Sequence, residues 1–178
     1  MKSVFATTCL AFCLLAFVTA AGAQEIVNFS DLPLVSVPAP MPSGYGQLEW
    51  SNFFYVDPFT WSDSGPGFQL GVQKRDVAFI GSRYCRLIGY ACFGTLSHPI
   101  GFQLVSATIA GGSGPTTFTV TAYNHGNYVG AANYFATTQL QTIQLPQQWG
   151  PVTELVFQVF GASGHLAVYE VRAYTLGG

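Results

Sequence analysis

The ionisable side chains of this sequence do not assemble a recognisable catalytic site. The three histidines, His98, His125 and His165, lie in separate turn-like segments, and no metal-ligand or triad spacing links them. Residues 161–165 miss the pattern of a nucleophile elbow at their last position. Several carboxylates could face each other as a glycosidase pair, but no spacing singles out two of them: Glu49, Asp57, Asp63, Asp76, Glu154 and Glu170. We therefore expect no catalytic residues.

Aromatic residues are the chemistry that this sequence supplies, since Phe, Trp and Tyr make 15% of the chain. Aromatic rings stack on the C–H faces of sugars, and uncharged Asn, Gln and Tyr groups bind sugar hydroxyls at little desolvation cost. Trp61 lies in a loop bounded by Gly and Pro, so it is the first candidate for a stacking platform; the alternative is a hydrophobic lid. The other candidate ligand-binding residues are Tyr84, Tyr90, Tyr128 and Trp149.

Charged residues make only 8% of the chain, with six Lys and Arg against eight Asp and Glu. An ordinary soluble domain is about 25% charged. This composition excludes a disordered tail, a coiled coil and a nucleic-acid-binding surface built on Lys and Arg. We expect no nucleic-acid partner.

The N-terminus has the pattern of a signal peptide. Lys2 precedes an apolar run over residues 4–18, and small residues at 19–23 predict cleavage after Ala23. A transmembrane anchor is the alternative, but the run is shorter than the about 20 residues that span a bilayer. We therefore expect a secreted, extracellular protein with one domain over residues 24–178 and no membrane span after cleavage.

Secretion would change the chemistry of the remaining cysteines and of one asparagine. Cys85 and Cys92 are the two cysteines beyond the leader, and in an oxidising compartment they predict a disulfide that closes a small loop. A zinc site would need two more ligands nearby, and none has the spacing. Asn28 begins an Asn-Phe-Ser sequon, which predicts a glycosylation site in a eukaryotic host.

Short strands separated by Gly, Pro, Asn and Ser must position these side chains, because no segment carries a helical stripe. Alternation is clearest where Phe118, Val120 and Ala122 share one face and threonines share the other. We expect a three-strand meander over residues 100–137 and a hairpin through 161–164. The proline-rich segment 32–46 should run extended over the surface. Strands are expected at 26–29, 47–56, 68–72, 77–80, 100–110, 116–124, 128–137, 139–145, 154–160 and 166–174.

Ten short strands without crossover helices predict an all-β protein, a two-sheet antiparallel jelly-roll sandwich. A family resemblance agrees with this fold. The segments IVNFSDLP at 26–33, GYGQLEWSNFF at 44–54 and SGPGFQLGV at 64–72 resemble an uncharacterised group of secreted fungal and bacterial proteins. The resemblance implies a jelly roll of the galactose-binding-like and carbohydrate-binding-module type. Ser30 replaces one Asp of that pattern, and Tyr169 and Glu170 stand where Asp-Asn would be.

The resemblance also implies a possible structural calcium ion between the first and last strands. Calcium takes six to eight oxygen ligands, and Asp31 and Glu170 could supply two carboxylates. In the alternative reading, Asp31 caps a turn before Pro33, and Glu170 pairs with Arg172 on an exposed strand face.

Together these features predict a secreted, non-catalytic β-sandwich protein that binds glycan at the cell wall or in the extracellular matrix. One alternative is a structural or host-interaction protein whose apolar surface contacts another protein. The other is a small extracellular glycan hydrolase, although a fold alone does not imply activity.

Overall fold

A computed structural model describes residues 24–70, 76–80, 92–160 and 164–177 of the chain. Its regular structure is antiparallel strand with two short 3-10 helices, and the described residues contain no α-helix. The predicted all-β antiparallel sandwich is confirmed. The expected signal peptide lies outside the described residues, and among these residues no helix has the length and apolar character to cross a membrane.

The elements follow one another along the chain as short strands, with one long strand, β6, at the centre of the sequence. Their bounds are β1 (Gln24–Val27), β2 (Ala39–Pro40), η1 (Tyr45–Gln47), β3 (Glu49–Ser51), β4 (Phe53–Val56), β5 (Val77–Ile80), β6 (Cys92–Gly111), β7 (Thr116–Asn124), β8 (Asn127–Ala136), β9 (Gln141–Gln144), η2 (Gln147–Trp149), β10 (Val152–Phe160) and β11 (Leu166–Thr175).

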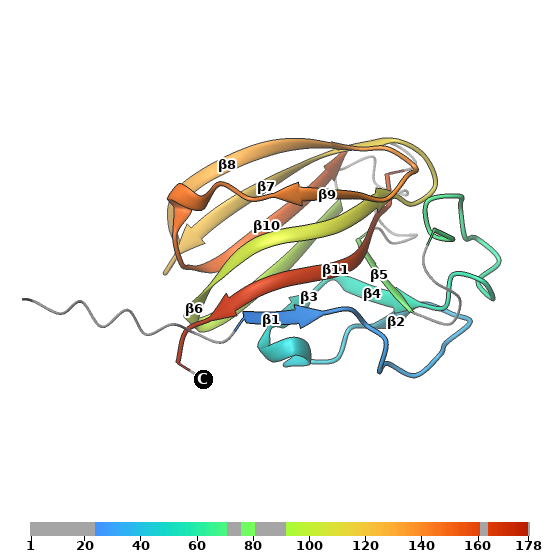
Figure 1. Cartoon of the computed structure of the whole chain (residues 1–178), viewed down its shortest axis with the longest axis horizontal. Helices are drawn as coiled ribbons and strands as arrows, with labels where there is room; N and C mark the ends of the chain where they lie inside the picture. The colour runs from blue at the N-terminus through green and yellow to red at the C-terminus, as the bar shows by residue number, and fades with distance from the viewer. Residues whose placement is uncertain (1–23, 71–75, 81–91, 161–163, 178) are drawn as a thin grey trace, which may run out of the picture.

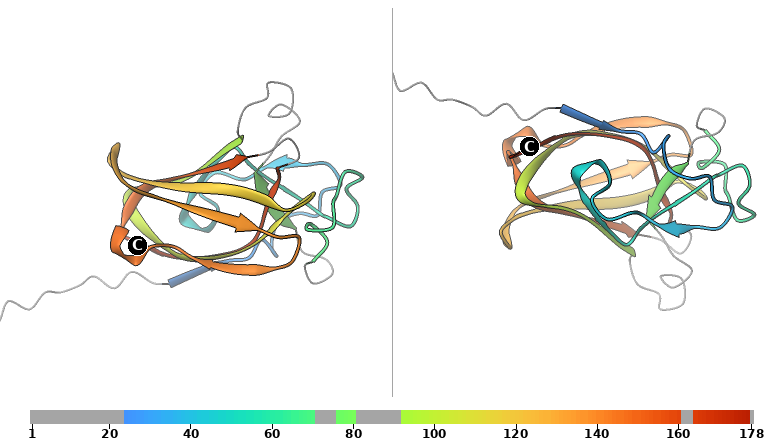
Figure 2. Two further views of the ribbon diagram at one scale, coloured as in Figure 1. Left: turned by 90° about the horizontal axis from the view of Figure 1, so that it is seen from above. Right: turned by 90° about the horizontal axis from the view of Figure 1, so that it is seen from below.

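The strands form two layers, and Figures 1 and 2 show them from three sides. The first layer has the order β3-β6-β10-β7-β8 and uses the first part of β6. The second layer pairs the last part of β6 with β9 and β11. The other edge of β11 pairs with β1 and with β5, which continues to β4 and β2. All these pairs are antiparallel, as predicted.

β6 joins the two layers because its backbone changes direction in the middle. Pro99 has no N–H to give to a ladder, and Gly101 has a φ of 136°, which glycine adopts most readily. The Gly101 N–H donates a hydrogen bond to Nδ1 of His98 at 3.1 Å, which closes the corner locally. The sequence prediction began this strand at residue 100 and so missed its first part, which starts at Cys92.

The core lies between the layers and follows the predicted alternation. Phe118, Val120 and Ala122 on β7 are fully buried, and the intervening threonines face outward. Gly94 on β6 has no room for a side chain, since a Cβ there would lie 2.8 Å from the Phe53 ring and from Ile80. The inner faces of both layers therefore meet in one large apolar cluster.

Two connections that the sequence suggested as hairpins instead run between layers. β7 pairs with β8 and β10, not with β6, so the predicted three-strand meander is wrong at its first pair. β10 and β11 likewise lie in different layers, each paired with β6. The glycine-rich segment at the end of β6 forms hydrogen bonds with residues far along the chain: the N–H of Gly111 donates to Thr137 O, and that of Gly112 donates to His165 O. The glycines there let two backbone segments approach each other closely. A glycine-rich sequence has the same composition in a tight turn, so the sequence alone does not distinguish the two cases.

A second, smaller apolar cluster lies on the outer side of the second layer, under the loop of residues 57–70. Its buried members are Val56, Phe68, Val77, Phe79 and Ala167. The predicted strand at 68–72 is wrong where it is described, because residues 68–70 form a turn that places the Phe68 ring in this cluster. Residues 71–72 lie outside the described ranges. The proline-rich segment contributes only the two-residue strand β2, in keeping with the predicted surface course.

Candidate functional site

Trp61, the first-choice stacking residue, lies in the second cluster. Its ring stacks on Phe79, with ring centroids 5.2 Å apart and planes at 24°, and meets Phe68 edge-on at 5.1 Å. The ring is half-buried by these contacts. The geometry is that of the hydrophobic lid, which was the alternative reading for this residue.

Tyr128 and Trp149 lie on different sides of β8. Tyr128 faces outward and is 66% exposed. Trp149, in η2, is partly buried against the main core, and its Nε1 lies 2.4 Å from where a Cβ of Gly130 would be. Tyr84 and Tyr90 lie outside the described residues. Among the described candidates, the structure therefore brings no two rings together on one open surface.

The open surface that carries exposed rings is the outward face of the first layer. We call it the aromatic–threonine face; it is formed by side chains of β6, β10, β7 and β8 that point away from the core. Its residues are Phe93, Thr95, Thr117, Thr119, Thr121, Tyr123, Tyr128, Ala131, Asn133, Phe135, Val156, Gln158 and Phe160.

Polar uncharged groups occupy the middle of this face. Thr119 pairs with Gln158 on β10 and with Asn133 on β8, so the three side chains lie in one row across the strands. The Thr119 hydroxyl donates a hydrogen bond to Oδ1 of Asn133 at 2.6 Å. Thr121 lies in the next row, about 7 Å along the strand. These groups offer hydroxyl and amide donors and acceptors without a formal charge.

Aromatic rings border the polar rows at both ends. At one end Tyr123 and Tyr128 meet edge-on, with ring centroids 6.2 Å apart. At the other end Phe160 and Phe135 flank Thr117 in the strand register. Their exposures are large for phenylalanine, 41% for Phe160 and 57% for Phe135. The polar rows in the middle of the face carry no charge, but Glu154 points out of the same face beside Tyr123, at the tyrosine end.

Only part of this face could be predicted from local patterns in the sequence. The alternation in β7 predicted that Thr117, Thr119 and Thr121 would share a solvent face. The strands that flank β7 decide what lies beside those threonines, and β10 follows β7 in the sequence only after three other elements, β8, β9 and η2. In the sequence, Phe135 and Phe160 therefore look like any other strand residues. Only the register of the strands shows that they lie on either side of Thr117.

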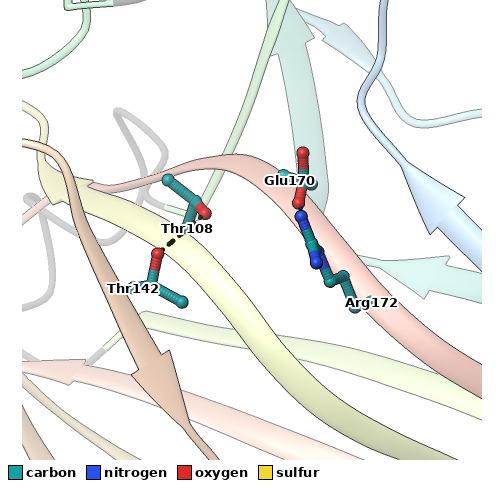
Figure 3. A network of polar contacts seen from close by, with 4 residues as sticks. All are labelled: Thr108, Thr142, Glu170 and Arg172. Atoms are coloured by element: carbon teal, nitrogen blue, oxygen red, sulfur yellow. Dashed lines mark hydrogen bonds and ion pairs between the residues drawn. The ribbon is translucent and has the colours of Figure 1, made fainter.

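Asp31 and Glu170, the two predicted calcium ligands, each have a protein partner. Glu170 Oε1 accepts a hydrogen bond from Nε of Arg172 at 2.7 Å, which is the ion pair of the alternative reading (Figure 3). A separate contact joins Thr108 and Thr142 on the same layer (Figure 3). Asp31 Oδ1 accepts a hydrogen bond from the Tyr45 hydroxyl. Within the described residues no three His, Cys, Asp or Glu side chains gather as metal ligands, and calcium at this place stays a prediction.

Two further predicted modifications are only partly visible. Cys92 is buried at the start of β6, but Cys85 lies outside the described residues, so their disulfide stays a prediction. Asn28 is half-buried just after β1, and its Oδ1 accepts hydrogen bonds from the Ser30 backbone N–H at 3.2 Å and hydroxyl at 2.7 Å. Glycosylation of Asn28 also stays a prediction.

A buried carboxylate pair lies at the end of the β4–β5 ladder. Asp57 and Asp76 follow directly beyond the last register pair, Val56 opposite Val77. They are only 8% and 2% exposed. The Phe59 N–H donates to Asp57 Oδ1 at 2.9 Å, but neither oxygen of Asp76 has a hydrogen-bond partner among the described residues. Burial, and then the charge of Asp57, raises the pKa of Asp76 to about 6.

This raised pKa predicts how the stability of the chelator-treated protein depends on pH. The folded chain holds the Asp76 proton more tightly than the unfolded chain does, so its stability falls as pH rises from about 4 to about 6. The loss is up to about 3 kcal/mol, and it is complete above that range. Thermal unfolding in EDTA between pH 4 and pH 8 measures it. Asp76→Asn should flatten this part of the profile; an equally steep fall in the variant would assign the effect to other groups.

His165 contacts a serine hydroxyl and the aromatic rings of the second cluster. The Ser113 hydroxyl lies 3.1 Å from Nδ1 of His165. The imidazole, however, packs edge-on against Trp61 and Phe68 in the second cluster. This contact fastens the loops around that cluster.

Comparisons with known proteins give likenesses of fold only. No family model and no curated protein sequence matches the chain. A DUF4465 family protein from Bacteroides caccae is 11% identical with a TM-score of 0.49, over 89% of this chain and 96% of that one. The family 32 carbohydrate-binding module from C. perfringens NanJ, solved with galactose, is 8% identical with a TM-score of 0.42, over 85% of this chain and 99% of that one. The family 11 module from Clostridium thermocellum, solved with a mixed-linked tetrasaccharide, is 11% identical with a TM-score of 0.44, over 88% of this chain and 97% of that one.

All these TM-scores are below 0.5, so the likenesses say nothing about what this chain binds. The uncharacterised secreted family suggested by the segments at 26–33, 44–54 and 64–72 stays a hypothesis.

Proposed function

We propose that the protein is a secreted, non-catalytic glycan-binding domain and that the aromatic–threonine face is its binding surface. The observation that carries the proposal is the composition of this face: uncharged hydroxyl and amide groups in central rows, bordered by exposed rings at both ends. Sugars present the complementary groups, hydroxyls at their edges and C–H bonds on their faces.

The dimensions of the face suit an oligosaccharide segment. From Thr117 to Tyr123 the strand advances six residues, which is about 20 Å. From β6 to β8 there are three strand spacings, about 14 Å. A surface of this length can contact several consecutive sugar units. The Tyr and Phe borders would then stack on units at the two ends.

Neutral glycans fit this face better than acidic ones. The face residues carry no positive charge, and Glu154 and Glu49 lie in the row of Tyr123. A polysaccharide with carboxylate or sulfate groups would approach two carboxylates without a cationic partner. The formal net charge of the whole chain, −2, acts in the same direction.

The proposal places the protein outside the cell, at a cell wall or matrix, because residues 1–23 have the composition of a signal peptide.

A second candidate function, contact with another protein, has one observation in its favour. Phe135 and Phe160 are exposed in the end row beside Thr117, and the exposed Phe93 lies one row further in, opposite Gln158. Exposed apolar patches also mark contacts between proteins.

Retention on insoluble polysaccharides tests the proposed function. The chain from residue 24 should be retained on at least one of cellulose, chitin, xylan and galactan, and less on a polygalacturonate resin. Free oligosaccharide of the same type should release it. Absence of retention on all four neutral matrices would reject the glycan proposal and favour the protein-contact alternative. Release of reducing sugar during the assay would instead support the hydrolase alternative.

A further inference from the structure

Asp57 and Asp76 form a buried pair of carboxylates whose negative charge no cationic side chain of the described residues neutralises. β4 and β5 are antiparallel and in register from Phe53 opposite Ile80 to Val56 opposite Val77, and Asp57 and Asp76 come next. Residues two positions apart on a strand point to the same face, so Asp57 shares the face of Tyr55, which packs in the main core. Directly opposed residues have Cβ atoms about 5 Å apart, and like charges there destabilise a sheet.

Burial makes this opposition costly. The two side chains are at most 8% exposed, and among the described residues the only hydrogen bond to either carboxylate comes from the Phe59 N–H. No Lys, Arg or His of the described ranges forms an ion pair with them; the ion pair found there joins Arg172 and Glu170. A buried carboxylate without a donor or a counter-charge costs several kcal/mol, so such groups are normally paired or bound to a metal.

We propose that Asp57 and Asp76 bind one calcium ion. Two carboxylates carry a charge of −2, which a divalent cation balances, and the Asp76 oxygens are both available as ligands. Calcium is a hard cation that accepts carboxylate, backbone carbonyl and water oxygens in variable geometry, whereas magnesium demands an octahedral set. The ion would tie the start of β5 to the end of β4, where the loop of residues 57–70 begins.

This site differs from the first predicted place for calcium, between Asp31 and Glu170. Those two carboxylates already accept hydrogen bonds from Tyr45 and Arg172. The proposal does not depend on glycan binding, since the pair lies on the core side of β4 and β5, in the second layer, and the aromatic–threonine face belongs to the first.

Calcium titration of the chelator-stripped chain from residue 24 tests the proposal at pH 7.5. With free calcium at about 100 times its dissociation constant, the melting temperature should rise by roughly 5–10 °C. Asp76→Asn should abolish this rise and the binding heat, while the matched variants Asp31→Asn and Glu170→Gln should keep both. Metal analysis after dialysis against micromolar calcium should find one calcium per wild-type chain.

Two results would overturn the site. One is a wild-type chain whose melting temperature and metal content do not respond to calcium, which would leave a proton as the group that neutralises the pair. The other is a response that persists in Asp76→Asn but disappears in Asp31→Asn or Glu170→Gln. If Asp76→Asn does not fold, Asp57→Asn and the metal content of the wild type decide the question.

Discussion

Trp61→Ala is expected to lower the melting temperature by roughly 5–10 °C while leaving glycan affinity unchanged. The indole stacks on Phe79 and meets Phe68 edge-on, so its removal opens the second cluster to water. Removing a large buried ring costs about 3–5 kcal/mol, and a half-buried ring somewhat less, about 2–3 kcal/mol. For a domain of this size each kcal/mol corresponds to about 2–4 °C. Thermal unfolding and polysaccharide retention, measured on the same preparation, test both parts.

Trp61→Phe is the control for this prediction, because it keeps an aromatic ring over Phe79 and should recover most of the lost stability. The opposite pattern, in which Trp61→Ala unfolds at the wild-type temperature but loses retention, would contradict the lid. Trp61 would then be the stacking platform that its loop position first suggested. The two readings thus differ in which of two measured quantities changes.

Tyr169 holds the loop of residues 57–70 in place by hydrogen bonds. Its hydroxyl donates a hydrogen bond to Gly67 O at 2.6 Å and accepts one from the Leu70 N–H at 3.3 Å. Burial raises the pKa of this hydroxyl to about 12, so it stays protonated and can donate at neutral pH. Tyr169 is the residue added by the bulge in β11 between Val168 and Glu170. The bulge turns an extra side chain toward the loop.

Local patterns in the sequence were sufficient to predict the class of fold. The alternation of Phe118, Val120 and Ala122 identifies a strand with one buried face, and that strand is present with the predicted bounds. Glycine-rich segments identify where the chain reverses, but not whether it returns beside the same strand or crosses to the other layer. The meander prediction failed for this reason, since β10 inserts between β6 and β7.

The candidate site depends on contacts between residues far apart in the sequence, which local patterns do not reveal. Asp57 and Asp76 become neighbours only through the β4–β5 register. A carboxylate that will be buried without a partner looks like any other acidic residue in a loop. In the same way, exposure separates Tyr128 from Trp149 although both stand near turns. Pairing between strands, which sets these environments, is specified by packing over the whole core.

The double variant Tyr128→Ala/Phe135→Ala is expected to weaken glycan binding about 100-fold with little loss of stability. The two rings border opposite ends of the aromatic–threonine face and are 66% and 57% exposed. Covering about 60 Å² of apolar ring surface by a sugar contributes about 1.5 kcal/mol per ring. Two such contributions correspond to about a hundredfold in the dissociation constant. Depletion binding on the polysaccharide that best retains the wild type measures this loss.

Phe59 provides the matched control for these rings. It is 47% exposed in the loop of residues 57–70, far along the chain from the face and on the side of the second layer. Phe59→Ala removes the same kind of exposed ring, so it should leave binding within about twofold of the wild type. Equal losses in Phe59→Ala and in the double variant would mean that retention follows general surface hydrophobicity. Full binding by the double variant would exclude the aromatic–threonine face as the binding surface. The proposed binding mode needs rings that stack on sugar units at both ends of the face, and the double variant lacks one ring at each end.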